Sequence, residues 1–119
     1  MTTFDQRANS GGMVMPPEVR VLVIAFNPAT YDAIEVARVA RAEFTDENVV
    51  GAILEALDMA ADAIGLEELA LWEPQVDLWL WSDRGQRAAM HLPREVMHRL
   101  AVANASLDID PYMCEPGRG

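Results

Sequence analysis

Lysine is missing from this 119-residue sequence, and all nine basic residues are arginine. Cysteine is nearly absent too, because Cys114 stands alone and cannot form an internal disulfide, as is typical of a reducing compartment. No apolar run approaches the roughly 20 residues that a helix needs to cross a bilayer. The first residues also lack the basic and apolar regions of a signal peptide. Together these absences predict a cytoplasmic protein without membrane attachment.

Recognisable catalytic and ligand-binding motifs are missing as well. The sequence contains no GxSxG, no Walker loop, no GxGxxG and no CxxC, HxH or HExxH spacing. His91, His98 and Cys114 therefore do not predict a zinc site. Asp108 and Asp110 share one face of an expected strand, but two carboxylates alone do not define a cation site. We expect no metal, no cofactor and no catalytic residue.

The acidic residues are unevenly distributed. The formal net charge is −10, and residues 42–83 contain eleven Asp and Glu with no Arg, Lys or His. Such a segment repels phosphate backbones, which argues against direct nucleic-acid binding and favours a basic protein partner. The alternative is that the acidity serves solubility alone.

The clearest element is a helix over residues 46–64, capped by Thr45 or Asp46 and ended by Gly65. Its apolar positions recur at helical spacing and predict a core stripe of Val50, Ile53, Leu54, Leu57, Ala61 and Ile64. Four acids are expected on the opposite face: Glu47, Glu55, Asp58 and Asp62.

Residues 28–44 are ambiguous. The Asn27-Pro28 pair and four alanines favour a helix over residues 31–44. The competing interpretation is a strand, in a hairpin with a buried strand over residues 19–26. Its inward-facing residues would be Ile34, Val36, Ala40, Ala42 and Phe44. The sequence does not decide between the two.

The remaining pattern predicts the fold class. Strands are expected over residues 75–82, 87–92 and 106–112, the first two joined as a hairpin, and a short helix starts at Pro93 with Val96, Met97, Leu100 and Ala101 inward. The predicted order is β-α-α-β-β-α-β if residues 31–44 are helical. We expect a single α+β domain over residues 18–114 between flexible tails (1–17 and 115–119), with an antiparallel sheet covered by helices on one face, in a ferredoxin-like or split βαβ arrangement.

Two tryptophans stand out on the expected strand over residues 75–82. If Val76, Leu78 and Leu80 meet the helices, Asp77, Trp79 and Trp81 point to the opposite face. Tryptophan is enriched in binding hot spots and pairs with cations. The alternatives are that both rings belong to the core, under the N-terminal segment, or to a homodimer interface.

The C-terminal third resembles a family of small bacterial domains of uncharacterised function. The resemblance covers about residues 75–113 and is carried by His91-Leu-Pro-Arg-Glu-Val96 and Leu107-Asp-Ile-Asp-Pro-Tyr112, which match the family's helix start and LDIDxY-type final strand. It implies that Leu107 and Ile109 pack inward, that both Asp face outward and that Tyr112 closes the core. Two features depart from the family pattern. Asn27-Pro28 matches the start of the family's first helix only loosely, and Pro111 lies within the final motif. The resemblance implies no activity; small acidic proteins of this type are similar to immunity or antitoxin-like inhibitors.

These observations predict a non-enzymatic, acidic protein-binding module. We expect an immunity-type or phage-encoded inhibitor that occludes a basic surface of a toxin or nucleic-acid-handling protein. The expected contacts are Glu47, Glu55, Asp58 and Asp62, with Asp77, Trp79 and Trp81 as an alternative or additional anchor. The other hypotheses are a ferredoxin-like dimer that binds a small ligand or acts as an enzyme through His91, Asp108 or Tyr112, and a structural homodimer through the Trp79/Trp81 face.

Overall fold

A hairpin begins the fold in the computed structural model, which describes residues 18–83 and 90–114. Strand β1 (Glu18–Phe26) pairs antiparallel with β2 (Ala33–Arg41). The helix expected over residues 31–44 is therefore wrong and the alternative strand is correct. Asn27 does not start a helix; its Oδ1 accepts a hydrogen bond from the backbone N–H of Ala29 (2.8 Å) inside the hairpin loop. Pairing with a buried strand outweighs the helical propensity of the alanines.

The two faces of the hairpin differ from the expected alternation. The register shifts between Val23 and Ile24, which leaves Val36 as the extra residue of a bulge in β2. Beyond the bulge, Ala37 and Val39 are buried toward the helices, whereas Ala40, expected to face inward, is exposed. One extra residue reverses the facing of every residue that follows it.

Helix α1 (Asp46–Ile64) confirms the strongest prediction from the sequence. Thr45 is the N-cap, and its Oγ1 accepts a hydrogen bond from the N–H of Asn48 (3.0 Å). The fully buried stripe is rotated slightly from the expected one: Val49, Ala52, Ile53, Ala56, Leu57 and Ala60. Val50, Leu54, Ala61 and Ile64 are only partly buried at its margins. The three alanines at four-residue spacing bring the helix close to the sheet.

Gly65 separates α1 from a second, short helix, α2 (Leu66–Leu71). Its φ of 86° and ψ of 143° lie in a region that is essentially restricted to glycine. Leu69 is the buried residue of α2. The chain then enters β3 (Gln75–Asp83) at the centre of the sheet.

The C-terminal part is a parallel β-α-β unit. Helix α3 (Arg94–Val102) connects β3 to β4 (Ser106–Cys114), and β4 lies parallel to β3 at the edge of the sheet. Val96 and Leu100 of α3 are buried as expected, but Met97 is 52% exposed and Ala101 is also exposed. These two residues lie outside the buried stripe, which continues instead to Ala103.

The expected hairpin strand over residues 87–92 is not found where the structure describes it. Residues 90–92 adopt no strand, and residues 84–89 lie outside the described part. Both edges of β3 are already paired, one with β1 and the other with β4.

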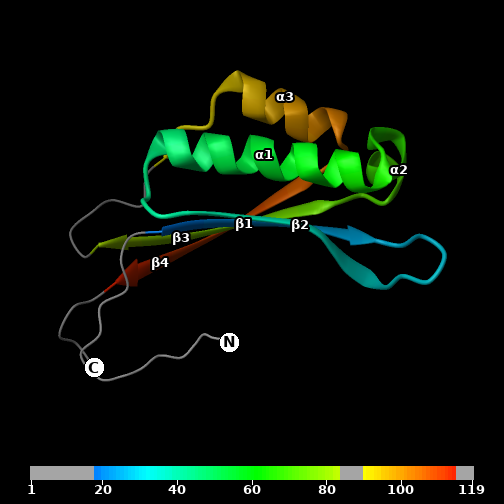
Figure 1. Cartoon of the computed structure of the whole chain (residues 1–119), viewed down its shortest axis with the longest axis horizontal. Coiled ribbons are helices and arrows are strands. Elements are labelled where there is room, and N and C mark those ends of the chain that lie inside the picture. Colours follow the sequence, from blue (N-terminus) through cyan, green and yellow to red (C-terminus); the bar gives the residue numbers. More distant parts are fainter. Residues whose placement is uncertain (1–17, 84–89, 115–119) are drawn as a thin grey trace.

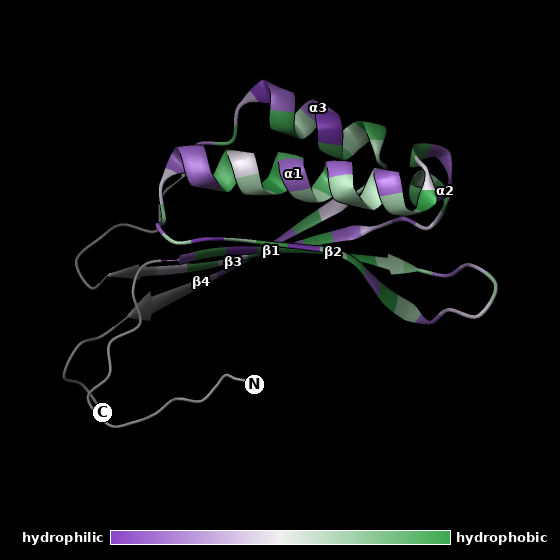
Figure 2. Ribbon diagram, in the orientation of Figure 1, coloured by the Kyte–Doolittle hydropathy of each residue, from purple (hydrophilic) through white to green (hydrophobic). Residues whose placement is uncertain are grey.

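The whole arrangement has two layers. A four-stranded sheet in the order β2-β1-β3-β4 is covered on one face by the three helices, and its other face carries no described element (Figure 1). Hydrophilic residues follow the outer surfaces of α1 and α3 (Figure 2). The α+β class and the single helical layer are confirmed, whereas the sheet is mixed rather than antiparallel and the observed order is β-β-α-α-β-α-β. The expected tails lie outside the described residues, and no described helix is long and apolar enough to cross a membrane.

Candidate functional site

The face of the sheet opposite the helices, which we call the open face, is built by the alternation of β3. Val76, Leu78 and Leu80 are buried against the helical layer, with at most 1% of each exposed. Trp79 and Trp81 therefore project to the open face, where both are half-buried, as predicted from the sequence. Asp77 lies on the same face.

The two tryptophans form a compact aromatic pair with a cation beside it. Their ring centroids are 6.1 Å apart and the planes meet at 77°, an edge-to-face arrangement. The Arg20 guanidinium carbon lies 5.1 Å from the centroid of the Trp81 ring, and Arg20 is also ion-paired with Glu18. The pair is thus held in place by contacts along β1 and β3, which gives a rigid aromatic surface.

Carboxylates gather on the open face beside this pair. In the parallel register of β3 and β4, Asp77 lies opposite Asp108 and Trp79 lies opposite Asp110. Asp77 accepts a hydrogen bond from the side-chain amide of Gln75 (2.8 Å), whereas Asp108 and Asp110 are exposed and form no hydrogen bond or ion pair with the described residues. Like charges directly opposite each other destabilise a sheet. A cation from outside would relieve that repulsion.

The four helix acids expected to form a second surface are only partly available. Glu55 of α1 is ion-paired with Arg41 of β2, and Asp58 is ion-paired with Arg99 of α3. Glu47 and Asp62 are exposed and make no such contact with the residues the structure describes. These two ion pairs neutralise part of the negative charge that was expected to contact a partner.

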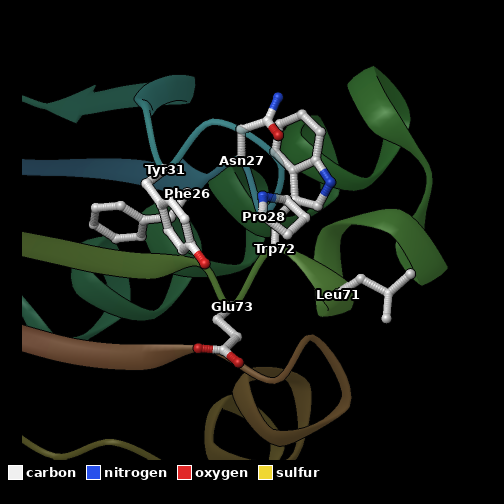
Figure 3. A pocket seen from close by; sticks show the side chains of 7 residues that line it. All are labelled: Phe26, Asn27, Pro28, Tyr31, Leu71, Trp72 and Glu73. Carbon is white, nitrogen blue, oxygen red and sulfur yellow. The ribbon is translucent and has the colours of Figure 1, made fainter.

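A pocket at one end of the molecule was not foreseen from the sequence. It has a volume of about 200 Å³ and lies between the loop of the β1–β2 hairpin and the segment that joins α2 to β3 (Figure 3). Its lining residues are Phe26, Asn27, Pro28, Tyr31, Leu71, Trp72 and Glu73. The sequence left β2 undecided, and only the β1–β2 hairpin brings the loop that carries Tyr31 to the segment that carries Trp72. A neighbouring pocket of about 240 Å³ is lined by Glu73, Pro74, Asn104 and Ser106.

The structure does not bring the remaining candidate metal-binding and catalytic residues together in one site. His91 contributes its backbone N–H to Asp46 (3.3 Å), and His98 is exposed on α3. No group of His, Cys, Asp and Glu within residues 18–83 and 90–114 could hold a metal ion. Neither described pocket includes His91 or Asp108. The side chains of Tyr112 and Cys114 lie outside the described part.

Comparisons with protein-family models, with curated proteins and with solved structures find no match to this chain.

Proposed function

We propose that this chain is a non-enzymatic protein-binding module that occludes a basic surface of a partner protein. An immunity-type or phage-encoded inhibitor of a toxin or nucleic-acid-handling protein, acting in the cytoplasm, fits the strongly acidic composition and the scarcity of cysteine. The primary contact surface in this proposal is the open face, with Trp79 and Trp81 at its centre.

The observation that carries the proposal is the combination of half-buried tryptophans with opposed carboxylates on one sheet face. Trp79 lies directly between Arg20 and Asp110 in the registers of its two neighbouring strands. An arginine or lysine of a partner would stack on the rings and neutralise Asp108 and Asp110 at the same time. Burying the rings supplies affinity, while the carboxylates accelerate association.

The exposed acids of α1 have a secondary role in the proposal. Glu47 and Asp62 add to the long-range negative field, but they lie on the layer opposite the open face. Charge reversal at Glu55 or Asp58 would set a lysine against Arg41 or Arg99 and disturb the fold, so it does not test binding. Neutralisation of Glu47 and Asp62 is the cleaner variant.

The test is affinity capture from an extract of the native host at low and high salt, followed by measurement of Kd with the recovered basic partner. Trp79→Ala should weaken binding by about 30-fold, as for a central hot-spot residue. Asp108→Asn combined with Asp110→Asn should weaken it by about fivefold, mostly through slower association. Circular dichroism of each variant checks that the fold is retained.

The matched control is Glu47→Gln combined with Asp62→Asn, which removes the same charge from the helical layer. If this control weakens binding as much as the open-face pair, the acidity acts only through the overall field. If no basic partner is recovered at low salt, or if Trp79→Ala binds like the unmodified chain, the proposal is wrong.

A further inference from the structure

The pocket at the end of the sheet is framed by two segments that are far apart in the sequence. One wall is the hairpin loop after β1, and the other is the segment that follows α2. The backbone N–H of Phe26 donates to the carbonyl of Trp72 (3.2 Å) and joins the two walls. Within the loop, the N–H of Tyr31 donates to the carbonyl of Asn27. The pocket is therefore a product of the fold and not a gap between loose ends.

The lining combines aromatic rings with one carboxylate. Figure 3 shows Phe26 and Tyr31 on one side of the opening, with Trp72 and Glu73 contributed by the opposite segment. The indole N–H of Trp72 already donates to Glu68 (3.2 Å), which fixes the ring. The Glu73 carboxylate is exposed and has no hydrogen bond or ion pair with another described residue. Aromatic rings beside an unpaired carboxylate are the chemistry that binds an organic cation.

Two further observations favour this pocket as a binding site. Tyr31 is 83% exposed and Leu71 is 68% exposed, although both are large and apolar. Tyr31 and Glu73 also adopt positive φ values of 63° and 49°, which residues other than glycine rarely adopt. Such backbone strain gathers at binding sites, where the surrounding structure holds it in place.

The size of the pocket narrows the choice of ligand. Its volume of about 200 Å³ is below the roughly 300 to 1,000 Å³ of ordinary small-molecule sites. It has room for one side chain rather than a cofactor. Among cationic side chains, the planar guanidinium both stacks on aromatic faces and pairs with a carboxylate through two hydrogen bonds.

We propose that this pocket binds a single arginine side chain of the protein partner, with the guanidinium against the rings of Tyr31 and Trp72 and paired with Glu73. This inference deepens the proposed function and rests on it, because the basic partner supplies the arginine. It adds a second contact, at the end of the sheet, to the one on the open face.

The experiment needs no partner and uses Nα-acetyl-arginine amide as the probe, added to the full chain and followed by ¹H–¹⁵N NMR. The indole signal of Trp72 is assigned with Trp72→Phe. We expect saturable shifts at the Trp72 indole and the Tyr31 amide, with a Kd of about 1 mM or weaker for so small a ligand. Nα-acetyl-citrulline amide, which has the same shape without the charge, should leave both signals in place.

The variants separate the carboxylate from general charge. Glu73→Gln should weaken binding of the probe by about fivefold, whereas Glu67→Gln, a matched loss of charge on α2 outside the pocket, should not change it. Tyr31→Asn removes the ring while keeping a residue that tolerates positive φ, and should abolish the shifts.

Equal shifts with the citrulline probe, equal effects of Glu73→Gln and Glu67→Gln, or shifts confined to Trp79 and Trp81 would each overturn this inference. A partner that is captured through Trp79 while the pocket ignores the probe would leave the proposed function standing. If the pocket binds the probe but no partner is recovered, arginine recognition by the pocket is supported and the proposed inhibitor function is overturned.

Discussion

At the scale of single residues, the ion pair between Glu35 and Arg38 shows how the protein holds its own charges. The Glu35 carboxylate accepts two hydrogen bonds from the Arg38 guanidinium, at 2.7 and 3.0 Å. These hydrogen bonds, reinforced by the positive charge, lower the pKa of Glu35 from its ordinary value of 4.5, although slight burial opposes the effect. The pair lies on β2, the strand whose bulge fixes which residues share a face.

Arg38→Gln should raise the pKa of Glu35 back to its ordinary range, as measured by NMR titration of the carboxyl group. Because the folded pKa is the lower one, the pair stabilises the protein above the unfolded pKa and loses this effect as the pH falls through the folded pKa. Both side chains are substantially exposed, so the loss of stability at neutral pH should be below about 0.5 kcal/mol. An unchanged Glu35 pKa in the variant would contradict this assignment.

Residue-level chemistry was partly readable from the sequence. The alternation of β3 placed Trp79 and Trp81 on the open face, because burial of Val76, Leu78 and Leu80 leaves them no other side. The pairing of Glu55 with Arg41 was not readable, since it requires a strand where a helix was expected. The pocket around Tyr31 and Trp72 was hidden for the same reason.

At the scale of elements, α1 has one glycine within it and another at its C-cap, and the two have opposite requirements. Gly51 lies inside the helix, and a Cβ built there meets no atom within 4 Å apart from the adjacent residues and the nearby backbone of the helix itself. Gly65 ends the helix at a φ of 86°. The first position therefore bears the entropic cost of glycine without any need for it, whereas the second uses its conformational freedom.

Gly51→Ala should raise the free energy of unfolding by about 0.5 to 1 kcal/mol, because alanine restricts the unfolded chain and favours the helix. Gly65→Ala should lower it by about 1 to 3 kcal/mol through backbone strain alone. Urea denaturation of both variants measures the two effects. A stabilising Gly65→Ala would show that the helix ends in a different conformation.

Element types were predictable wherever periodicity was strong. The pattern of residues 46–64 and the buried run at residues 19–26 each identified an element with nearly correct bounds. Residues 33–41 failed because their alanines fit a helix, and only pairing with β1 makes a strand favourable. The parallel arrangement of β3 and β4 depends on how α3 crosses the sheet, which local propensity does not encode.

At the scale of the whole molecule, the two layers leave one face of the sheet that no described element covers. For the proposed function this face must be accessible in the free protein, so light scattering should give the monomer mass of 13.1 kDa. Trp79→Asp should leave that mass unchanged. A mass of about twice this value, halved by Trp79→Asp, would instead assign the open face to a homodimer of stacked sheets.

The edges of the sheet have a consequence for solubility. Unpaired strand edges are templates for the addition of further strands, and proteins protect them with bulges, charges and proline. The bulge and Arg38 protect β2, while Pro111 and the exposed Asp108 and Asp110 that precede it protect β4. Neither edge offers a flat, uncharged template for amyloid-like growth. The molecule can therefore carry half-buried tryptophans on the open face while both edges of its sheet are protected against pairing with further copies.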